Sequence, residues 1–591
     1  MPTARPYSSP PRRPLKIFAF DPMLGRAAAN RVTLNVDNEA LVPGPIGAQI
    51  EVVDYDAAEQ TLYRPVDLDE PSVLMNGGLD PSESDPRFHQ QMVYAVTMKV
   101  LENFETALGR RLMFRRRKKL RLYPHGFRGA NAFYDPTQTA VLFGYFRADE
   151  DDPGANLPGQ TVFSCLSHDI IAHEVSHALV DRLRPEFMEA TNVDVYAFHE
   201  AFADIVAIFQ HFSFDDVLAT TIQSTRSDLR TPNALGELAA QFGYATGGGE
   251  ALRSTGAGEI PNPRLYEKLV EPHDRGAILV AAVFDAFFNV YQARIADLIR
   301  ISTGGSGVLP VGNLHPDLVY RIAREASKTA RQFLQMSIRA FEYLPPVDVT
   351  FGDFLRAIVT ADYLTVPGDE RGLRAALIEG FRVRGIHPEN VTSLAQESLL
   401  WEPVASGLKL PFRLSQEALG LNAMAFDRGA ERPVPEEVDR KRLDAWAVAL
   451  KRFARDNAAR LGLVPGKPIR LGGFHTLFRV SPDGQLLIEL VARFLQQDQK
   501  LSGDPAFGGL KLLGGSTVVA TSNGTVRYVI AKPLSAGRVE QMRAFVELCD
   551  SRDAMLAWGG TRYEKTRMRM QNFANIHRHR PRSVTPAGET L

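Results

Sequence analysis

Apolar residues recur at spacings of three and four positions through most of the middle of the chain. This periodicity is typical of helices with one buried face. It predicts helices at about 86–110, 167–184, 195–212, 275–300, 315–342, 350–363 and 370–383. Short alternating apolar runs, separated by turn-forming pairs, predict strands over 16–66 and 111–150. Strands followed by helices indicate an α+β fold.

The pattern changes after residue 386. Residues 387–435 are rich in turn-forming residues, and we interpret them as a linker. A smaller α+β domain is expected over 436–560, because helical spacing resumes there and is followed by strand patterns. Its predicted elements are a helix at 436–460, strands within 468–533 and a last helix at 536–559.

The two ends of the chain have no periodic pattern. Residues 1–15 are Pro-rich, and we expect them to be disordered. Residues 561–591 form a basic tail.

The segment DIIAHEVSH (169–177) carries the strongest chemical signal. His173 and His177 are four positions apart, so a helix presents both imidazoles on one face, where they can bind one metal ion. Glu174 lies beside them and can take a proton from a metal-bound water. The segment therefore predicts a zinc-binding helix of a hydrolase.

A second segment, HEAFAD, provides the third ligand that catalytic zinc requires. Glu200 follows His177 by 23 positions, and Asp204 follows Glu200 by four. Apolar neighbours predict that this helix is buried, where carboxylates are costly unless paired or metal-bound. We therefore predict Glu200 as the third ligand and Asp204 as the acceptor of a ring N–H from a zinc histidine. A solvated helix face is the alternative for the short motif, and the buried second segment counts against it.

These motifs together resemble the thermolysin-like zinc metallopeptidases, the gluzincins, over about residues 85–386. Similarity extends to FHQQMVYAVTMKVLENFETALG (88–109), NAFYDPTQTAVLFGYF (131–146) and LIEGFRVRGI (377–386). The resemblance implies a two-lobed catalytic unit with the zinc helix at the floor of a cleft. The lobes would be a β-rich lobe over 16–190 and a helical lobe over 191–386.

The resemblance also implies residue roles. In the NAF segment, the Asn131 side chain and the Ala132 backbone would hold the main chain of a peptide substrate. In LRS (252–254), Arg253 would bind a substrate carbonyl. In PHDRGAI (272–278), His273 would stabilise the transition state.

The chain departs from the family pattern near these residues. The family's oxyanion tyrosine has no clear equivalent, and Tyr196 is not assigned its role because it lies one turn before Glu200. The aspartate that orients the catalytic histidine is missing at its usual spacing. The candidates to replace it are Glu267, Glu271 and Asp274.

The family's calcium site is expected to be absent. Asp169 matches one calcium ligand, but Gln210, His211 and Phe212 replace the acidic residues that would complete it. Calcium needs several hard oxygen ligands in one place. We interpret Asp169 as a helix N-terminal charge and expect one zinc ion as the cofactor.

Composition limits the partners. The formal net charge is -1 over 591 residues, which gives no reason to expect nucleic acid or an anionic membrane. The sequence shows neither a membrane span nor a secretory signal, so we expect cytoplasmic residence, with signal-independent export as the alternative. Two cysteines are too few for a disulfide framework. Cys165 is interpreted as a small buried residue rather than a ligand.

We therefore predict a zinc-dependent metalloendopeptidase that acts on peptide or protein substrates, with Glu174 as the general base. A zinc aminopeptidase is the nearest alternative, although no GxMEN-like segment precedes residue 167. A zinc-stabilised binding or delivery protein with weak catalysis is the alternative from another class. The missing oxyanion tyrosine favours that third hypothesis, and the intact Glu174 disfavours it. Oligomeric state is not predicted.

Overall fold

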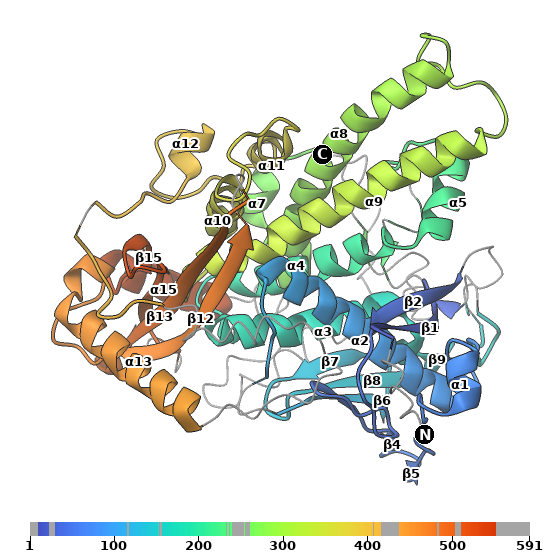
Figure 1. The fold of residues 1–591 in the computed structure, drawn as a ribbon, viewed down its shortest axis with the longest axis horizontal. Coiled ribbons are helices and arrows are strands. Elements are labelled where there is room, and N and C mark those ends of the chain that lie inside the picture. The colour runs from blue at the N-terminus through green and yellow to red at the C-terminus, as the bar shows by residue number, and fades with distance from the viewer. Residues whose placement is uncertain are drawn as a thin grey trace, which may run out of the picture.

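A computed structural model of the chain shows a mixed α+β architecture, which confirms the predicted fold class (Figure 1). The structure describes residues 10–22, 30–114, 118–151, 153, 156–231, 233, 235, 237–238, 253–254, 260–405, 407–414, 437–480, 484–502, 507 and 510–550. The predicted basic tail and most of the later half of the predicted linker lie outside these residues.

A five-stranded sheet dominates the first part of the chain. Its strands are β3 (Ile50–Val52), β6 (Leu120–Arg128), β7 (Ala132–Asp135), β8 (Ala140–Arg147) and β9 (Thr161–Phe163). The order is β3-β6-β8-β7, and β9 also pairs with β8. Strands β3, β6 and β8 are parallel, whereas β7 runs antiparallel to β8 and ends the row. Strand β7 is therefore an edge strand among the described residues.

Two short antiparallel pairs flank this sheet. Strand β1 (Arg12–Phe18) pairs with β2 (Arg31–Asp37), and β4 (Tyr55–Asp56) pairs with β5 (Thr61–Leu62). Strand β1 begins inside the segment 1–15 that was predicted to be disordered. That prediction was wrong from Arg12 onward, because this backbone pairs with β2 and buried Arg13 bonds Asp69. Residues 1–9 lie outside the described residues.

Three long helices lie at the centre of the molecule. They are α2 (Pro86–Leu108), α3 (His168–Leu183) and α4 (Val193–His211). Each matches its predicted range to within two residues. Every residue of α4 after Val193 is buried, as expected for a helix that is apolar on most sides. Helices α3 and α4 pack against each other, and α3 also contacts β7.

The helical part that follows also matches the predicted ranges to within three residues. Its long helices are α8 (Pro272–Ser302), α9 (Pro316–Arg339), α10 (Phe351–Tyr363) and α11 (Leu373–Arg382). Helix α5 (Asp215–Thr225) was not predicted, and it bends by 90° from α4. The shorter elements of the chain are α1 (Pro71–Met75), β10 (Glu237–Leu238), β11 (Arg253–Ser254), α7 (Arg264–Lys268), α12 (Gln396–Leu399) and α14 (Gln499–Ser502).

Helix α8 is long and apolar enough to cross a membrane, and the bent pair α4 and α5 passes the same test together. Within α8, however, 72% of the most apolar stretch is buried inside the protein. It packs between α4, α9 and α11. These features are those of a core helix.

The C-terminal elements form a four-stranded antiparallel sheet with two helices (Figure 1). The strands are β12 (Arg470–Val480), β13 (Leu486–Gln497), β14 (Leu513–Thr521) and β15 (Val526–Lys532), and the helices are α13 (Glu437–Asp456) and α15 (Ala536–Asp550). All four strands fall within 468–533, as predicted. On β13, Leu490 and Ala492 belong to a cluster shared with α13, whereas Val491 joins the main core. The sheet is therefore buried on both faces.

Ion pairs around two largely buried carboxylates join this sheet to the rest of the protein. Glu342, at 1% exposure, binds Arg110 after α2 at 2.9 Å and His475 of β12 at 2.6 Å. Glu186, in the segment between α3 and α4, pairs with Arg470 at 3.1 Å and Arg493 at 3.6 Å. The C-terminal sheet is thus attached next to the connection between the two central helices.

We predict that Glu342→Ala lowers the free energy of unfolding by about 3–5 kcal/mol, because it leaves the largely buried Arg110 guanidinium without its carboxylate partner. Chemical denaturation of the full chain measures this change. The control is Glu379→Ala, which removes an exposed pair with Arg382 and is expected to cost much less. Equal losses in the two variants would contradict the structural role assigned to Glu342.

Candidate metal centre

Helix α3 presents two histidines, one turn apart, to the protein interior. The helix begins after Ser167, whose side chain accepts a hydrogen bond from the Ile170 backbone N–H. His173 is 4% exposed and His177 is fully buried. Their Nε2 atoms lie 2.9 Å apart. The two imidazoles therefore converge on one point.

Helix α4 brings the carboxylate of Glu200 to the same point. Its Oε2 lies 3.3 Å from His173 Nε2, and its Oε1 lies 3.6 Å from His177 Nε2. Glu200 is 1% exposed. A carboxylate buried to this degree is unfavourable without positive charge or donors around it.

The three side chains fit a bound metal ion. Tetrahedral coordination with bonds of roughly 2.0–2.1 Å places neighbouring ligand atoms about 3.3 Å apart. The observed separations, from 2.9 to 3.6 Å, bracket that value. Two imidazole nitrogens and one carboxylate oxygen also form a donor set used for catalytic divalent metals. Tertiary structure thus brings together three residues from two helices in the arrangement that a metal requires.

Glu174 belongs to the same cluster. Its carboxylate and the ring nitrogens of His173 and His177 offer ligand atoms that all lie within 4.8 Å of one another. Glu174 is 2% exposed. A carboxylate at this place is close enough to exchange a proton with a group held between the histidines.

His173 and His177 each also have a partner at the Nδ1 atom, which orients the ring. Asp204 Oδ1 lies 2.8 Å from His173 Nδ1, so the ring N–H donates to the carboxylate and Nε2 faces the cluster. His177 Nδ1 lies 3.3 Å from Nδ1 of His199, a fully buried residue on α4. Burial lowers the pKa of His199 to about 3, so its ring is neutral at pH 7. His199 was missed at the sequence level, although it directly precedes Glu200.

His273 lies in the first turn of α8 and reaches the cluster. Its Nε2 is 3.3 Å from Glu200 Oε2, and its Nδ1 is 2.9 Å from Glu271 Oε1. The side chain is 25% exposed, so it lies between the buried cluster and solvent. Glu271, one of the three acids considered from the sequence, hydrogen-bonds this ring. It also caps α8, because it accepts from the Asp274 backbone N–H.

Close packing holds this end of α8 against α4. Arg275 donates to Asp194 Oδ1 at 2.6 Å, and both side chains are buried. Asp194 Oδ2 in turn accepts from Tyr266 Oη at 2.7 Å and from the Phe351 backbone N–H at 3.0 Å. A Cβ on Gly276 would lie 2.9 Å from the Ala197 carbonyl oxygen, so glycine permits this approach. His273 is therefore held at a defined distance from Glu200.

The predicted substrate-binding residues lie in two parts of the chain: Asn131 and Ala132 at strand β7, and Arg253 in β11. Ala132 begins edge strand β7 and pairs with Phe143 of β8. The Asn131 carbonyl accepts from the Gly144 backbone N–H at 2.9 Å. Tyr134 of β7 donates to Asp181 at 2.8 Å, which ties this edge to α3, the helix that carries His173 and His177. The backbone of Arg253 lies in β11, but its side chain is outside the described residues.

Asp169, which matches a calcium ligand of the resembled family, lies in the first turn of α3 and is buried. Its carboxylate contacts His211 Nε2, and it lies 3.5 Å from His168 Nδ1. This group therefore offers two imidazoles and one carboxylate, whereas calcium prefers several oxygens. The expectation that calcium does not bind there stays a prediction.

The Tyr196 hydroxyl hydrogen-bonds the backbone that precedes α4. The hydroxyl donates to the Met188 carbonyl at 3.1 Å, and the residue is 3% exposed. This contact packs the segment between α3 and α4. The contact gives no reason to assign the oxyanion role to Tyr196.

No model of a known protein family matches the chain, and no curated protein matches it. A solved structure, the precursor of protealysin, a metalloproteinase from Serratia proteamaculans, is similar with a TM-score of 0.32 and 14% sequence identity. The similarity covers 59% of this chain and 90% of that one. A likeness at this level supports no argument about activity.

We predict that Asp204→Asn weakens metal binding about 10- to 100-fold, because it removes the anionic acceptor that orients His173. Titration of the metal-loaded protein with a competing chelator measures the change. Asp216→Asn, on the exposed face of α5, is the matched control. Unchanged affinity in the Asp204 variant would contradict its assignment as an orienting residue.

Proposed function

We propose that this chain is a zinc-dependent metalloendopeptidase. The observation that carries the proposal is the meeting of His173, His177 and Glu200 in one buried cluster, with Glu174 beside them. Two imidazoles and one carboxylate are the protein ligands of a zinc hydrolase site that keeps a fourth position open. We assign Glu174 to proton transfer rather than to holding the ion.

In the proposed reaction, the chain's own residues transfer protons and orient the ligands of the zinc ion that would activate the water and the carbonyl. When bound, Zn²⁺ acts as a Lewis acid that makes water nucleophilic near neutral pH and polarises a carbonyl. Glu174 takes the proton of the attacking water and then gives it to the leaving amine. Asp204 keeps His173 in the tautomer whose Nε2 faces the ion.

His273 is proposed to stabilise the oxygen that becomes negatively charged in the transition state. Glu271 holds its Nδ1, which directs Nε2 toward the cluster. Its partial exposure supports this proposal, because a residue that contacts substrate must be reachable from solvent. A preorganised donor at such a position lowers the barrier, because the charge develops only in the transition state.

Substrate binding is proposed at the free edge of β7. An extended peptide can add to an edge strand through main-chain hydrogen bonds. Asn131 and Ala132 lie at the start of that strand, and Arg253 is proposed to bind a substrate carbonyl. We also propose the two-lobed, thermolysin-like arrangement, with a lobe over 16–190 and a lobe over 191–386.

We predict that Glu174→Gln retains zinc and loses cleavage of a casein-type substrate, because the variant keeps the ligands and lacks the base. His173→Ala is expected to lose both zinc and cleavage. Metal analysis and steady-state hydrolysis of the same samples separate these results. Exposed Glu397→Gln is the matched control. Full cleavage by the Glu174 variant would rule out its role as the base.

The two alternative functions are distinguished by the choice of substrate. An endopeptidase cleaves a peptide blocked at both ends, whereas an aminopeptidase cleaves only a free aminoacyl reporter. A binding or delivery protein holds zinc and cleaves neither substrate. Chelator must abolish any cleavage that is assigned to this centre.

We predict that His273→Ala lowers kcat about 100- to 1000-fold while zinc content is unchanged, as for the loss of one oxyanion donor. Exposed His387→Ala is the control. Steady-state kinetics on the blocked peptide measure the change. A loss confined to KM would instead assign His273 to substrate binding.

A further inference from the structure

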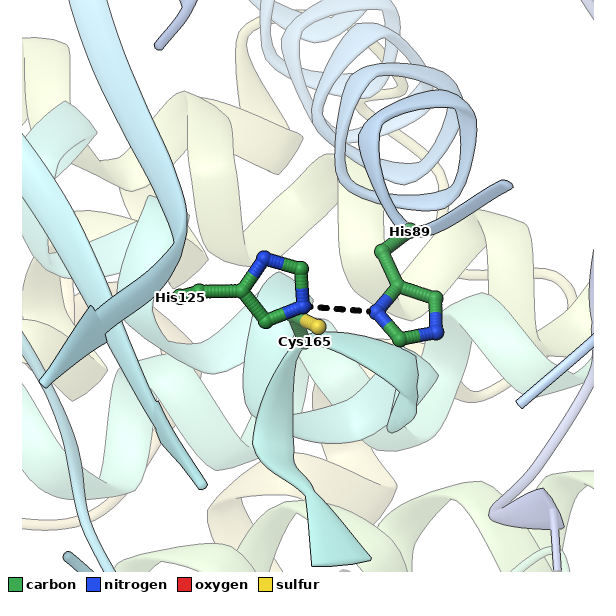
Figure 2. A group of neighbouring side chains, drawn as sticks. All are labelled: His89, His125 and Cys165. Atoms are coloured by element: carbon green, nitrogen blue, oxygen red, sulfur yellow. Dashed lines mark hydrogen bonds between the residues drawn. The ribbon is translucent and has the colours of Figure 1, made fainter. Parts of the chain in front are cut away.

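A second group of possible metal ligands lies apart from the centre described above, and shares no residue with it. It consists of His89 on α2, His125 on β6 and Cys165 in the short 3-10 helix Ser164–Leu166 (Figure 2). Their ligand atoms all lie within 4.8 Å of one another. The exposures are 1%, 2% and 0%. Cys165 is buried as predicted, but two distant histidines join it, so its interpretation as a packing residue is incomplete.

The hydrogen bonds of His125 determine which ring nitrogen faces the group. Its Nδ1 lies 2.7 Å from Asp54 Oδ1, and Asp54 Oδ2 accepts from Gln90 Nε2 at 2.8 Å. The Gln90 amide orientation is fixed, because its Oε1 accepts from the Val66 backbone N–H. Asp54 therefore acts as an acceptor, and His125 donates from Nδ1. In the neutral ring, Nε2 carries the lone pair.

His89 is oriented in the same way from the opposite side. Its Nε2 lies 3.1 Å from the Glu83 carbonyl oxygen, which can only accept. The ring therefore donates from Nε2, and Nδ1 carries the lone pair.

Two lone pairs thus face each other, with His89 Nδ1 and His125 Nε2 only 2.8 Å apart (Figure 2). Such an arrangement is repulsive unless a cation or a proton lies between the nitrogens. Phe163 packs against both rings in tilted and edge-on geometry, with centroid distances of 4.7 and 5.5 Å, and Tyr63 contacts His125 at 4.9 Å. These walls enclose the group in an apolar environment, where unmatched polar atoms are costly.

We propose that His89, His125 and Cys165 bind a second zinc-class transition-metal ion. Imidazole and thiolate together select such metals over calcium or magnesium. The Cys165 thiolate and the Asp54 carboxylate balance the charge of a divalent ion, so the buried group becomes neutral. Asp54 then fills the outer position that acids occupy behind metal-binding histidines. This inference does not depend on the proposed peptidase activity.

The position of the site suggests a structural role. Cys165 lies two residues before Ser167, which begins α3, whereas His89 and His125 lie on α2 and the sheet. A metal bound there links three elements that are distant in sequence. It also fixes the start of the helix that carries His173.

Cobalt substitution tests the proposal on the full chain. A thiolate ligand gives a thiolate-to-cobalt charge-transfer band in the near ultraviolet, which the His173, His177 and Glu200 cluster cannot produce. We expect Co²⁺-loaded wild type to show this band. Cys165→Ser is expected to lose the band and one metal equivalent per chain, relative to wild type. Cys549→Ser is the matched control and keeps both.

A third variant separates the two metal sites. His173→Ala is expected to keep the thiolate band while it loses the metal equivalent of the other centre. The thiolate band therefore tests the Cys165 site even if the proposed peptidase activity is wrong.

A wild-type protein that binds Co²⁺ without the band overturns the proposal, and so does a band that survives in Cys165→Ser. A proton shared between His89 and His125, with no metal bound at Cys165, would give the first result. If the Cys165 variant does not fold, X-ray absorption on zinc-loaded wild type decides. A sulfur neighbour at about 2.3 Å from zinc supports the site, and its absence overturns it.

Discussion

Glu200 is a carboxylate held at 1% exposure between apolar helices, and histidines from two neighbouring helices surround it. An isolated charge in such surroundings would destabilise the fold. His173, His177 and His273 approach its two oxygens within 3.3 to 3.6 Å. The histidines come from α3 and α8, whereas Glu200 comes from α4. The cluster therefore forms only when these three helices pack together. A bound divalent ion would complete this compensation.

The position of α8 is determined by polar contacts that are themselves buried. Asp194, in the first turn of α4, bonds Arg275, Tyr266 and the start of α10. The close approach at Gly276 then lets α8 lie directly on α4. These contacts place His273 near Glu200 without involving either residue in the anchoring. The C-terminal sheet acts similarly at the other end, where Glu186 holds the connection between α3 and α4.

Local sequence determined most of the secondary structure. The predicted helices that carry His173 and Glu200 begin and end within two residues of α3 and α4, because caps such as Ser167 and Asn192 and a continuous apolar pattern act locally. Helix α5 and the start of β1 were not predicted. Strand β1 depends on pairing with β2, which is a nonlocal contact. Its Pro-rich beginning has the local composition of a disordered segment.

For the candidate site, sequence alone determined the residue types and their spacing. His173, Glu174 and His177 lie on one helix, so helical geometry places them together without further information. Only the tertiary structure showed that Glu271 hydrogen-bonds His273, which it reaches from its capping position at the start of α8. It also decided that Cys165 lies beside His89 and His125. Those residues are 76 and 40 positions away in the chain, and no local periodicity encodes a contact between a helix, a strand and a loop at such separations.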